Sequence, residues 1–495
     1  MGEGATTNSY TVLDLEYEDA LVSRRLYSEV GIEHRSLSTL VYNVDLKLNG
    51  NTFSEILGTF GMIAVSHIPT FASTNDTLQN CIEFGASLYT LTGINDISID
   101  GLVIKNHTIS DLLAINFIHA IPNDIMLMTL SNVEVSDIVL GNSQIVSFSG
   151  TNNQFTLINS SFNNISVSDI GLIKVANLDM ININNVTFTG ISNTDEVESP
   201  YILGIDALNL DSAEQFIIQN VVVSSTNIGF FHLDSIKNTA ATTKVLELNN
   251  IQFESCEYEK SANLLNIEKI LTTEDFYIQI SEASFVDLNF EFGGNMIHMN
   301  AHMPKGLHVI DTVVRNVTSG SFLVESSNTQ YSVPTLMILN NLTTEAVEVE
   351  YDSLIQIYDR AQLQIWDSEL SNINCFEEGA VLFAGSESTQ TTIYNTVIQN
   401  NAALQGGVFD IESKSIVTLH NCTLKNNFAI EGGVVWARSE GYFEFYNTTI
   451  TENYALSLSV GEIFDSVIES TLNNCVLNNN EVISNEEFLS EINSR

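Results

Sequence analysis

A polar residue followed three positions later by an apolar one recurs along most of this chain at intervals of 26 to 35 residues. Phrases such as "LINSSF", "INNVTF" and "YNTVI" carry it. We expect Asp100 to start the polar column, whose further members are Asn132, Asn159, Asn185, Asn220, Asn250, Glu282, Asp311, Asn340, Asp367, Asn395, Asn421, Asn447 and Asn474. Such self-similarity predicts a repeat architecture, so 495 residues need not mean several globular domains.

Apolar residues alternate just before the column, as in the pairs Phe155/Leu157 and Val417/Leu419. A period of two indicates strands, and helical repeats of the ankyrin or HEAT type are disfavoured. Leucine-rich repeats have a similar length, but the strict leucine ladder is missing. We therefore predict an all-β fold, a single-stranded right-handed parallel β-helix (solenoid) of about 14–16 rungs, each stacked ~4.8 Å above the last.

Equivalent residues of such a solenoid stack into ladders, and an asparagine amide can both donate to and accept from the next one. We expect the asparagines of the column to turn inward as a structural ladder. A second polar column lies two residues after the apolar anchor and predicts a tight turn, because asparagine tolerates left-handed backbone. Its members are Asp137, Asn164, Ser255, Asp287, Asn316, Asn372, Asn400, Asn426, Glu452 and Asn479.

Glycines mark another position of the repeat. The stretches "NNAALQGGVFDI" and "NNFAIEGGVVWA" carry paired glycines 26 residues apart. A phosphate loop would need Lys-Ser/Thr after them, but Val408 and Val434 follow instead. We predict structural glycines at a corner, where backbone passes closely or φ is positive. The glycines nine residues after the apolar anchor are Gly171, Gly294, Gly379, Gly407 and Gly433.

With "TVIQNNAALQGGVFDI" and "TLKNNFAIEGGVVWA" in view, the chain resembles the surface-protein branch of right-handed parallel β-helix (pectin-lyase-like) proteins. It is similar to the repeats of chlamydial polymorphic outer membrane proteins and of large protist surface proteins. The phrases are clear over 361–482 and weaken upstream. The resemblance implies the fold and an extracellular or cell-surface location, and says little about activity.

The repeat divides the chain into four segments. Residues 1–37 are acidic and unpatterned and are expected to form an N-terminal lead-in or cap, and 38–99 form irregular first rungs. The regular parallel β-helix spans 100–482. Residues 483–495 form either a C-terminal cap or a truncated continuation, because exposed solenoid ends are adhesive edges that proteins normally cover.

The charge of the chain limits its partners. There are 17 Lys and Arg against 61 Asp and Glu, a net charge of −44. Such a chain repels nucleic acid and anionic lipid, and it attracts Ca²⁺ or basic partners. No apolar run reaches the ~20 residues of a membrane helix, so no direct membrane span is expected in this chain.

The five cysteines are expected to be mostly unbridged. They are Cys81, Cys256, Cys375, Cys422 and Cys475. Of these, Cys422 and Cys475 share a column, but Thr448 occupies the rung between them. Two rungs are about 9.6 Å apart, which is too far for a disulfide.

Catalytic signatures of glycan-cleaving β-helices are missing from the sequence. No Asp-Asp, Gly-His-Gly or Arg-x-Lys motif occurs, and the rungs contain only Arg315, Arg360 and Arg438, with no matching acidic cluster in the sequence around them. We interpret the pair Glu377/Glu378 as part of a solvated loop. Hydrolysis needs two carboxylates at a defined separation. We therefore predict that the chain is not an enzyme.

The tract "MIHMNAHMPKGLHV", in which His298, His302 and His308 lie among methionines, is a candidate metal site. A soft metal such as copper would need these side chains to converge. We favour a structural role. No EF-hand loop is present. We expect no cofactor, with calcium as the alternative.

Nine Asn-x-Ser/Thr sequons occur, about the number that chance gives for so many asparagines and hydroxyl residues. An inward-facing ladder amide cannot carry a glycan. The candidates for glycosylation are therefore Asn75, Asn106 and Asn341.

Together these observations predict a non-catalytic, extracellular or cell-surface β-helix rod with a structural, assembly or adhesion role. Its expected partners are proteins, further copies that associate into filaments, or glycans. Two alternatives stay open. One is a glycan-cleaving β-helix enzyme, a polysaccharide lyase or glycoside hydrolase with an unusual acidic site. The other is a glycan-binding adhesin.

Overall fold

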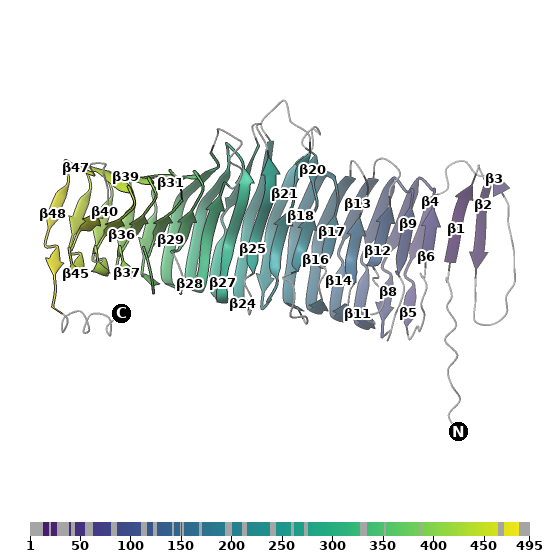
Figure 1. Cartoon of the computed structure of the whole chain (residues 1–495). Coiled ribbons are helices and arrows are strands. Elements are labelled where there is room, and N and C mark those ends of the chain that lie inside the picture. Colours follow the sequence, from purple (N-terminus) through teal and green to yellow (C-terminus); the bar gives the residue numbers. More distant parts are fainter. Residues whose placement is uncertain are drawn as a thin grey trace, which may run out of the picture. The chain divides into compact units, whose positions relative to one another are not determined.

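Figure 1 shows the computed structural model of the chain, which describes strands at 13–18, 21–26 and 39–40 and most of 45–484. Within 45–484 the residues left undescribed are 55–62, 81–86, 110–115, 122–125, 141–142, 149, 151–152, 168–170, 194–199, 210–214, 238–243, 259–261, 272–275, 327–333, 351–352, 387 and 464–469. Most of the predicted lead-in at 1–37 and of the cap at 483–495 therefore lies outside the described residues.

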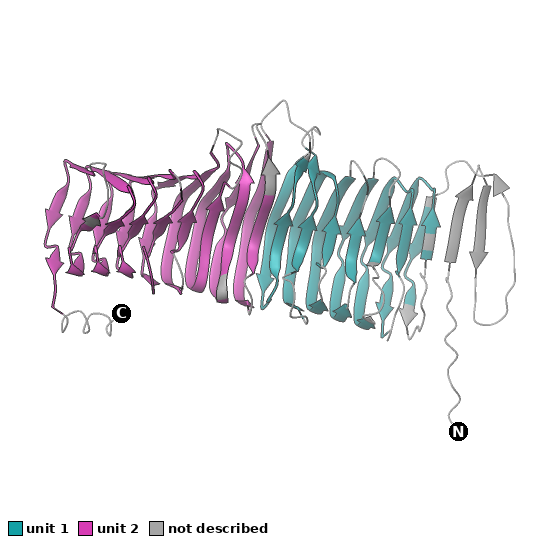
Figure 2. Ribbon diagram, viewed as in Figure 1, with its two compact units in different colours: residues 1–238 teal, residues 239–495 magenta. Residues whose placement is uncertain are grey.

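The described part of the chain is all-β, with 72% of residues in strands and no helix. Its parallel strands form a β-solenoid of about 13 turns, which confirms the predicted parallel β-helix with slightly fewer turns than expected. The residues form two compact units, Met1–Asn238 and Thr239–Arg495 (Figure 2).

The strands of the first unit are β1 (Leu13–Glu18), β2 (Leu21–Leu26), β3 (Thr39–Leu40), β4 (Asp45–Asn49), β5 (Thr52–Ser54), β6 (Ile63–Ser66), β7 (Thr70–Thr74), β8 (Thr77–Gln79), β9 (Tyr89–Thr92), β10 (Asp96–Asp100), β11 (Val103–Ile109), β12 (Asn116–Ile121), β13 (Met126–Ser131), β14 (Glu134–Leu140), β15 (Gln144–Phe148), β16 (Asn153–Val167), β17 (Ile173–Val175), β18 (Leu178–Asn193), β19 (Tyr201–Ile205), β20 (Leu208–Asn209), β21 (Phe216–Ser224), β22 (Gly229–Leu233) and β23 (Ile236–Lys237).

The strands of the second unit are β24 (Lys244–Tyr258), β25 (Asn263–Leu271), β26 (Phe276–Ser281), β27 (Ser284–His302), β28 (Leu307–Glu325), β29 (Leu336–Val349), β30 (Ile355–Ile357), β31 (Gln362–Trp366), β32 (Glu369–Ser371), β33 (Ile373–Cys375), β34 (Leu382–Ala384), β35 (Gln390–Tyr394), β36 (Val397–Gln399), β37 (Ala402–Gln405), β38 (Phe409–Ile411), β39 (Ile416–His420), β40 (Thr423–Lys425), β41 (Phe428–Glu431), β42 (Val435–Ala437), β43 (Tyr442–Tyr446), β44 (Thr449–Thr451), β45 (Tyr454–Ser457), β46 (Gly461–Ile463), β47 (Thr471–Asn473), β48 (Val476–Asn478) and β49 (Glu481–Val482).

One turn of the second unit illustrates the repeat. It consists of β39, β40, β41 and β42, and each strand pairs in parallel with the strand one turn later. The partners lie 26 residues apart, as the glycine phrases predict: Val417↔Phe443, Leu424↔Ile450, Ala429↔Ala455 and Val435↔Gly461.

Alternating burial along the strands gives each unit its core. In β39 and β43, every second side chain points inward, which is the period of two seen in the sequence. Equivalent aromatic residues also stack between turns: the rings of Phe162 and Phe188 are 5.0 Å apart, and those of Phe253 and Phe285 are 5.1 Å apart. Like residues therefore pack on like residues inside the coil.

Both polar columns of the sequence lie at left-handed turns. All ten members of the second column have φ between 51° and 59°. In the first column Asn340 was assigned wrongly: Ile310 pairs with Asn340, so Asp311 aligns with Asn341, which has φ of 55°. The predicted first member of this column, Asp100, lies one residue too early, because the positive φ belongs to Gly101.

The predicted inward direction of the first column is wrong. Asn132, Asn159, Asn185, Asn220, Asn395, Asn421, Asn447 and Asn474 are exposed, and Asn250 is half-buried. The amides still form a ladder on the surface, as shown by the bonds from Asn185 Nδ2 to Asn159 Oδ1 at 2.9 Å and from Asn474 Nδ2 to Asn447 Oδ1 at 2.6 Å. The left-handed backbone, not burial, accounts for asparagine at these positions.

A different set of asparagines forms a buried ladder. Asn401, Asn427 and Asn453 have no exposed surface. Each Nδ2 donates to the Oδ1 one turn later, at 3.1 Å, 3.0 Å and, from Asn453 to Asn480, 2.8 Å. The main-chain N–H of each residue donates to the same oxygen. In the sequence, each buried asparagine directly follows a residue of the second polar column: Asn401 follows Asn400, Asn427 follows Asn426, and Asn453 follows Glu452.

The structural glycines allow close backbone approach. A Cβ on Gly171, Gly294, Gly379, Gly407 or Gly433 would lie 2.3–2.5 Å from a main-chain oxygen. The prediction that Gly379 is equivalent to Gly407 and Gly433 is wrong by one residue. Its φ of 52° makes Gly379 equivalent to Gly406 and Gly432, which have φ of 56° and 61°. Gly407 and Gly433 follow these and lack the positive φ. The two glycines of each pair therefore have different roles.

Candidate functional site

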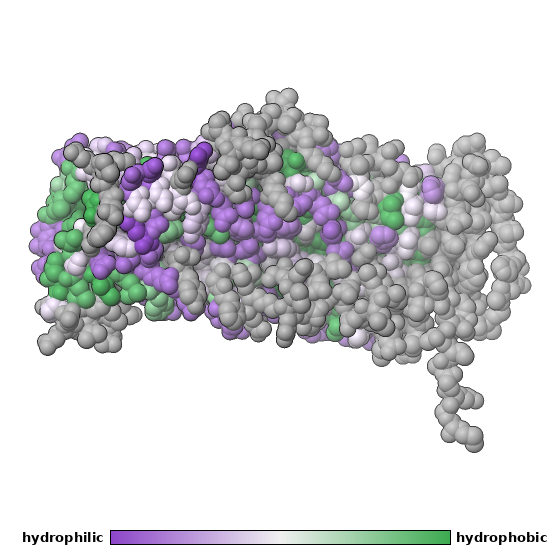
Figure 3. All heavy atoms as spheres, viewed as in Figure 1, coloured by the Kyte–Doolittle hydropathy of each residue, from purple (hydrophilic) through white to green (hydrophobic). Residues whose placement is uncertain are grey.

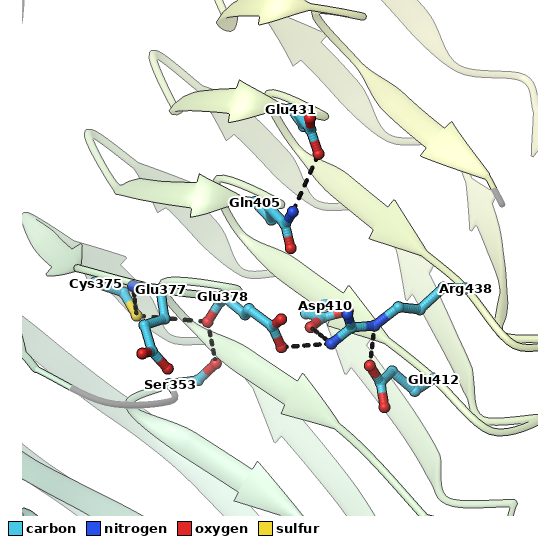
Figure 4. A network of polar contacts seen from close by, with 9 residues as sticks. All are labelled: Ser353, Cys375, Glu377, Glu378, Gln405, Asp410, Glu412, Glu431 and Arg438. Carbon is cyan, nitrogen blue, oxygen red and sulfur yellow. Dashed lines mark hydrogen bonds and ion pairs between the residues drawn. The ribbon is translucent and has the colours of Figure 1, made fainter.

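Four charged side chains converge on the outer side of three consecutive turns (Figure 4). Asp410 lies in the middle of β38, where it pairs with Phe383 of β34 on one side and Trp436 of β42 on the other. Glu412 follows β38, and Arg438 follows β42. Glu378 comes from the turn before β34. The solenoid register therefore brings together residues that are up to 60 positions apart.

Arg438 contacts all three carboxylates. Its Nη2 donates to Glu378 Oε2 at 2.6 Å and lies 3.4 Å from Asp410 Oδ2, and its Nε forms an ion pair with Glu412 Oε1. The guanidinium carbon is 4.1 Å from the ring centre of Trp436, a cation–π distance. Arg438 thus bridges successive turns through its ion pairs, and it stacks on Trp436 of its own turn.

Solvent access differs sharply within the cluster. The side chains of Glu378 and Arg438 are 29% exposed and that of Glu412 is 22% exposed, whereas Asp410 is fully buried. Burial and the neighbouring Glu378 raise the pKa of Asp410 to about 9, although Arg438 acts to lower it. The Oδ1 atom of Asp410 makes no hydrogen bond to the described residues.

The turn that carries Glu378 is fixed by its neighbours. The main-chain oxygen of Glu378 accepts from Ser353 Oγ at 2.9 Å and from Cys375 Sγ at 3.5 Å. The N–H of Glu377 donates to the same sulfur at 3.4 Å. These bonds hold the carboxylate of Glu378 toward the cluster rather than in a free loop (Figure 4).

One expectation from the sequence is therefore wrong: Glu378 belongs to an acidic cluster instead of a solvated loop. The carboxylates around Arg438 come from preceding turns and not from the sequence that flanks it. A signal was available, because Glu412 and Arg438 both lie five residues after the second glycine of their repeat. Opposite charges at one position of adjacent turns predict a contact across the ~4.8 Å step.

The carboxylates have limited chemical options. Oxygen atoms of Glu378, Asp410 and Glu412 lie within 4.8 Å of one another, the one such group of three or more ligand-type side chains among the residues that the structure describes. A general acid has to reach its substrate. Full burial of Asp410 prevents that contact in this arrangement, whereas burial is compatible with holding a cation or with a purely structural ion cluster.

The histidine–methionine tract serves the core. Met296, Met299 and Met303 have no exposed surface. His298 Nδ1 lies 2.9 Å from Asn266 Oδ1 and 3.1 Å from Asn263 Nδ2. The other two histidines have different surroundings. His302 is buried. The Nε2 atom of His308 hydrogen-bonds to the main-chain oxygen of Lys305, and its ring stacks on Tyr277.

The four described cysteines, Cys256, Cys375, Cys422 and Cys475, form no disulfide with one another, and Cys81 lies outside the described residues. Cys422 Sγ donates to His420 O at 3.4 Å, just as Thr448 Oγ1 donates to Tyr446 O at 3.1 Å one turn later. Cysteine thus takes the place of a hydroxyl residue in this column.

The glycosylation candidates Asn75, Asn106 and Asn341 are exposed, but this does not separate them from the other sequons. Each belongs to one of the two left-handed columns, with φ of 54°, 56° and 55°. Asn159, Asn185, Asn421 and Asn447 are exposed as well. An inward-facing amide therefore does not exclude these four sequons from glycosylation, and that prediction is wrong.

In the part of the chain that the structure describes, no helix has the length and apolar character to cross a membrane. Comparison with protein-family models and with curated proteins finds no match to the chain, so the interpretation of the cluster depends on its geometry.

Proposed function

We propose that the chain is a non-catalytic β-solenoid of an extracellular or cell-surface assembly, with a structural or adhesive role. The observation that carries this proposal is the closed state of the charged cluster. Arg438 neutralises all three carboxylates in part, and Asp410 has no exposed surface. Such a cluster stabilises the stack of turns, and it offers no open pair of carboxylates to a polysaccharide.

The location is supported by the repeat phrases. Their similarity to pectin-lyase-like surface proteins, including chlamydial polymorphic outer membrane proteins and large protist surface proteins, favours an extracellular or cell-surface site. Antibodies against the β39–β43 region, applied to intact cells of the source organism, test this point. Binding without permeabilisation supports the proposal, and binding only after permeabilisation contradicts it.

The surface of the second unit favours a protein partner. Trp366, Tyr394, His420 and Tyr446 stack in a row on the outer face of β31, β35, β39 and β43, with ring centres 4.0, 4.8 and 5.1 Å apart. Because the rings stack face to face, they present mainly their edges to solvent. A sugar ring that needs an open aromatic face would find few here.

Exposed apolar side chains point in the same direction. Figure 3 shows hydrophobic surface over the end of the second unit that carries β45 and β48. Leu458, Leu472, Val476 and Val482 are 43–60% exposed there. Apolar surface of this kind is typical of association with protein.

The enzyme alternative has one specific observation in its favour. Two carboxylates, Glu378 and Asp410, lie close together, and the pKa of Asp410 is raised toward the range of a general acid. A panel of acidic and neutral polysaccharides, assayed with and without Ca²⁺, separates the hypotheses. Product formation that Glu378→Gln abolishes supports the enzyme. Saturable binding on a glycan array without product supports the adhesin.

A further inference from the structure

We propose that Glu378, Asp410 and Glu412 form a binding site for a hard divalent cation, of which Ca²⁺ fits best, and that the guanidinium of Arg438 competes with the cation for the same carboxylates. The site would lie on the outer side of β38, between the turns that carry Glu378 and Arg438 (Figure 4).

The spacing of the carboxylates fits a single ion. Their oxygen atoms lie within 4.8 Å of one another. Ca²⁺ takes oxygen ligands at about 2.3–2.6 Å, so two ligands on opposite sides of one ion are at most about 5 Å apart. One ion placed among Glu378, Asp410 and Glu412 can therefore contact all three once the guanidinium of Arg438 has moved out of the cluster.

The buried side chain of Asp410 is an independent indication. Asp410 has no exposed surface, and its Oδ1 atom makes no hydrogen bond to the described residues. Buried oxygen atoms of this kind are normally satisfied by protein, water or an ion. A cation in the cluster would satisfy this oxygen, whereas Arg438 reaches the other oxygen, Oδ2, at 3.4 Å.

Charge and donor type indicate which ion. Three carboxyl groups face a single guanidinium, so acidic groups outnumber basic ones in the cluster and a divalent cation can offset the excess. The donors are all carboxylate oxygens, a set that favours Ca²⁺, Mg²⁺ or Mn²⁺ over Zn²⁺. Three carboxylates that bind through both oxygens would give six ligands, and Ca²⁺ tolerates such irregular coordination better than Mg²⁺.

The effect of removing Arg438 on cation affinity distinguishes a cation site from a purely structural cluster. In a purely structural cluster, loss of Arg438 leaves three carboxylates repelling one another and only weakens the fold. In a cation site, loss of the competing positive charge also tightens cation binding. Arg438 contacts all three carboxylates, so its guanidinium occupies the position that the cation would take.

Terbium luminescence offers a direct test, because Tb³⁺ replaces Ca²⁺ and is excited by a nearby tryptophan. The chain has two tryptophans, Trp366 and Trp436, and only Trp436 adjoins the cluster. In a Trp366→Phe background we expect saturable Tb³⁺ emission that Ca²⁺ displaces. Arg438→Gln should raise the affinity at least tenfold, and Glu378→Gln with Glu412→Gln should lower it at least tenfold.

A matched control accounts for the acidic surface. Asp367→Asn with Glu369→Gln removes the same charge from exposed positions outside the cluster and should leave the affinity unchanged. Emission that does not saturate, or an equal loss in the control, would show adventitious binding and overturn the proposal. If the Glu378/Glu412 variant does not fold, the Arg438 variant decides: unchanged or weaker affinity contradicts the site.

Discussion

Replacement of Asn427 by alanine should destabilise the last turns of the second unit strongly. The Oδ1 of Asn427 accepts from the main-chain N–H and from Nδ2 of Asn401, at 3.2 and 3.1 Å. Its Nδ2 donates to Ile398 O at 3.1 Å and to Asn453 Oδ1 at 3.0 Å. Alanine removes all four bonds inside a fully buried environment.

The magnitude follows from these bonds. The N–H of Asn401 becomes a buried donor without an acceptor, which costs about 1–3 kcal/mol, and each of the other three lost bonds costs about 1 kcal/mol. We expect a loss of about 4–6 kcal/mol in unfolding free energy. The matched control is Asn421→Ala on the exposed ladder, where the main cost is a left-handed alanine, about 1 kcal/mol.

Urea unfolding followed by Trp436 fluorescence in a Trp366→Phe background measures both losses, because β42 belongs to the same turn as Asn427. A local probe is needed, since long repeat proteins need not unfold in one step. Losses for Asn427→Ala and Asn421→Ala that agree within about 0.5 kcal/mol would refute the role of the buried ladder.

Gly407→Ala should cost about 1–3 kcal/mol in the same unfolding assay, because its Cβ would lie 2.4 Å from Gly433 O, whereas Gly461→Ala, whose nearest atom is 3.7 Å away, should be close to neutral. Burial lowers the pKa of His298 although Glu268 acts to raise it. The unfolded chain then takes up this proton first, so stability should fall as the pH drops below about 6.5. His298→Gln should flatten that part of a plot of stability against pH, and an unchanged slope would contradict this origin.

Much of the fold could be predicted from the polar columns alone. Left-handed backbone restricts which residues are accepted, so both columns leave a periodic trace in the sequence. One error arises at the adjacent asparagines Asn340 and Asn341, and the buried ladder was missed at pairs such as Asn400/Asn401. One residue of each pair takes the turn while its neighbour takes another direction, and a shift of one residue exchanges inside and outside. Composition gives no means of choosing between them.

The charged cluster was harder to predict because it depends on an exact superposition of turns of unequal length. Asp410 aligns with Phe383, 27 residues earlier, and with Trp436, 26 residues later. Only Glu412 and Arg438 share a position that the glycine register shows. The turn before β34 has an additional residue, and this brings Glu378 toward Arg438.

The most direct test of the scaffold proposal is the chain length of a polysaccharide before and after prolonged incubation with the protein, over a panel of acidic and neutral polymers with and without Ca²⁺. We predict an unchanged length distribution, even for a polymer that the protein binds. Shortened chains from the unaltered protein, together with intact chains from the Glu378→Gln variant, would contradict the proposal and place a catalytic site at the cluster.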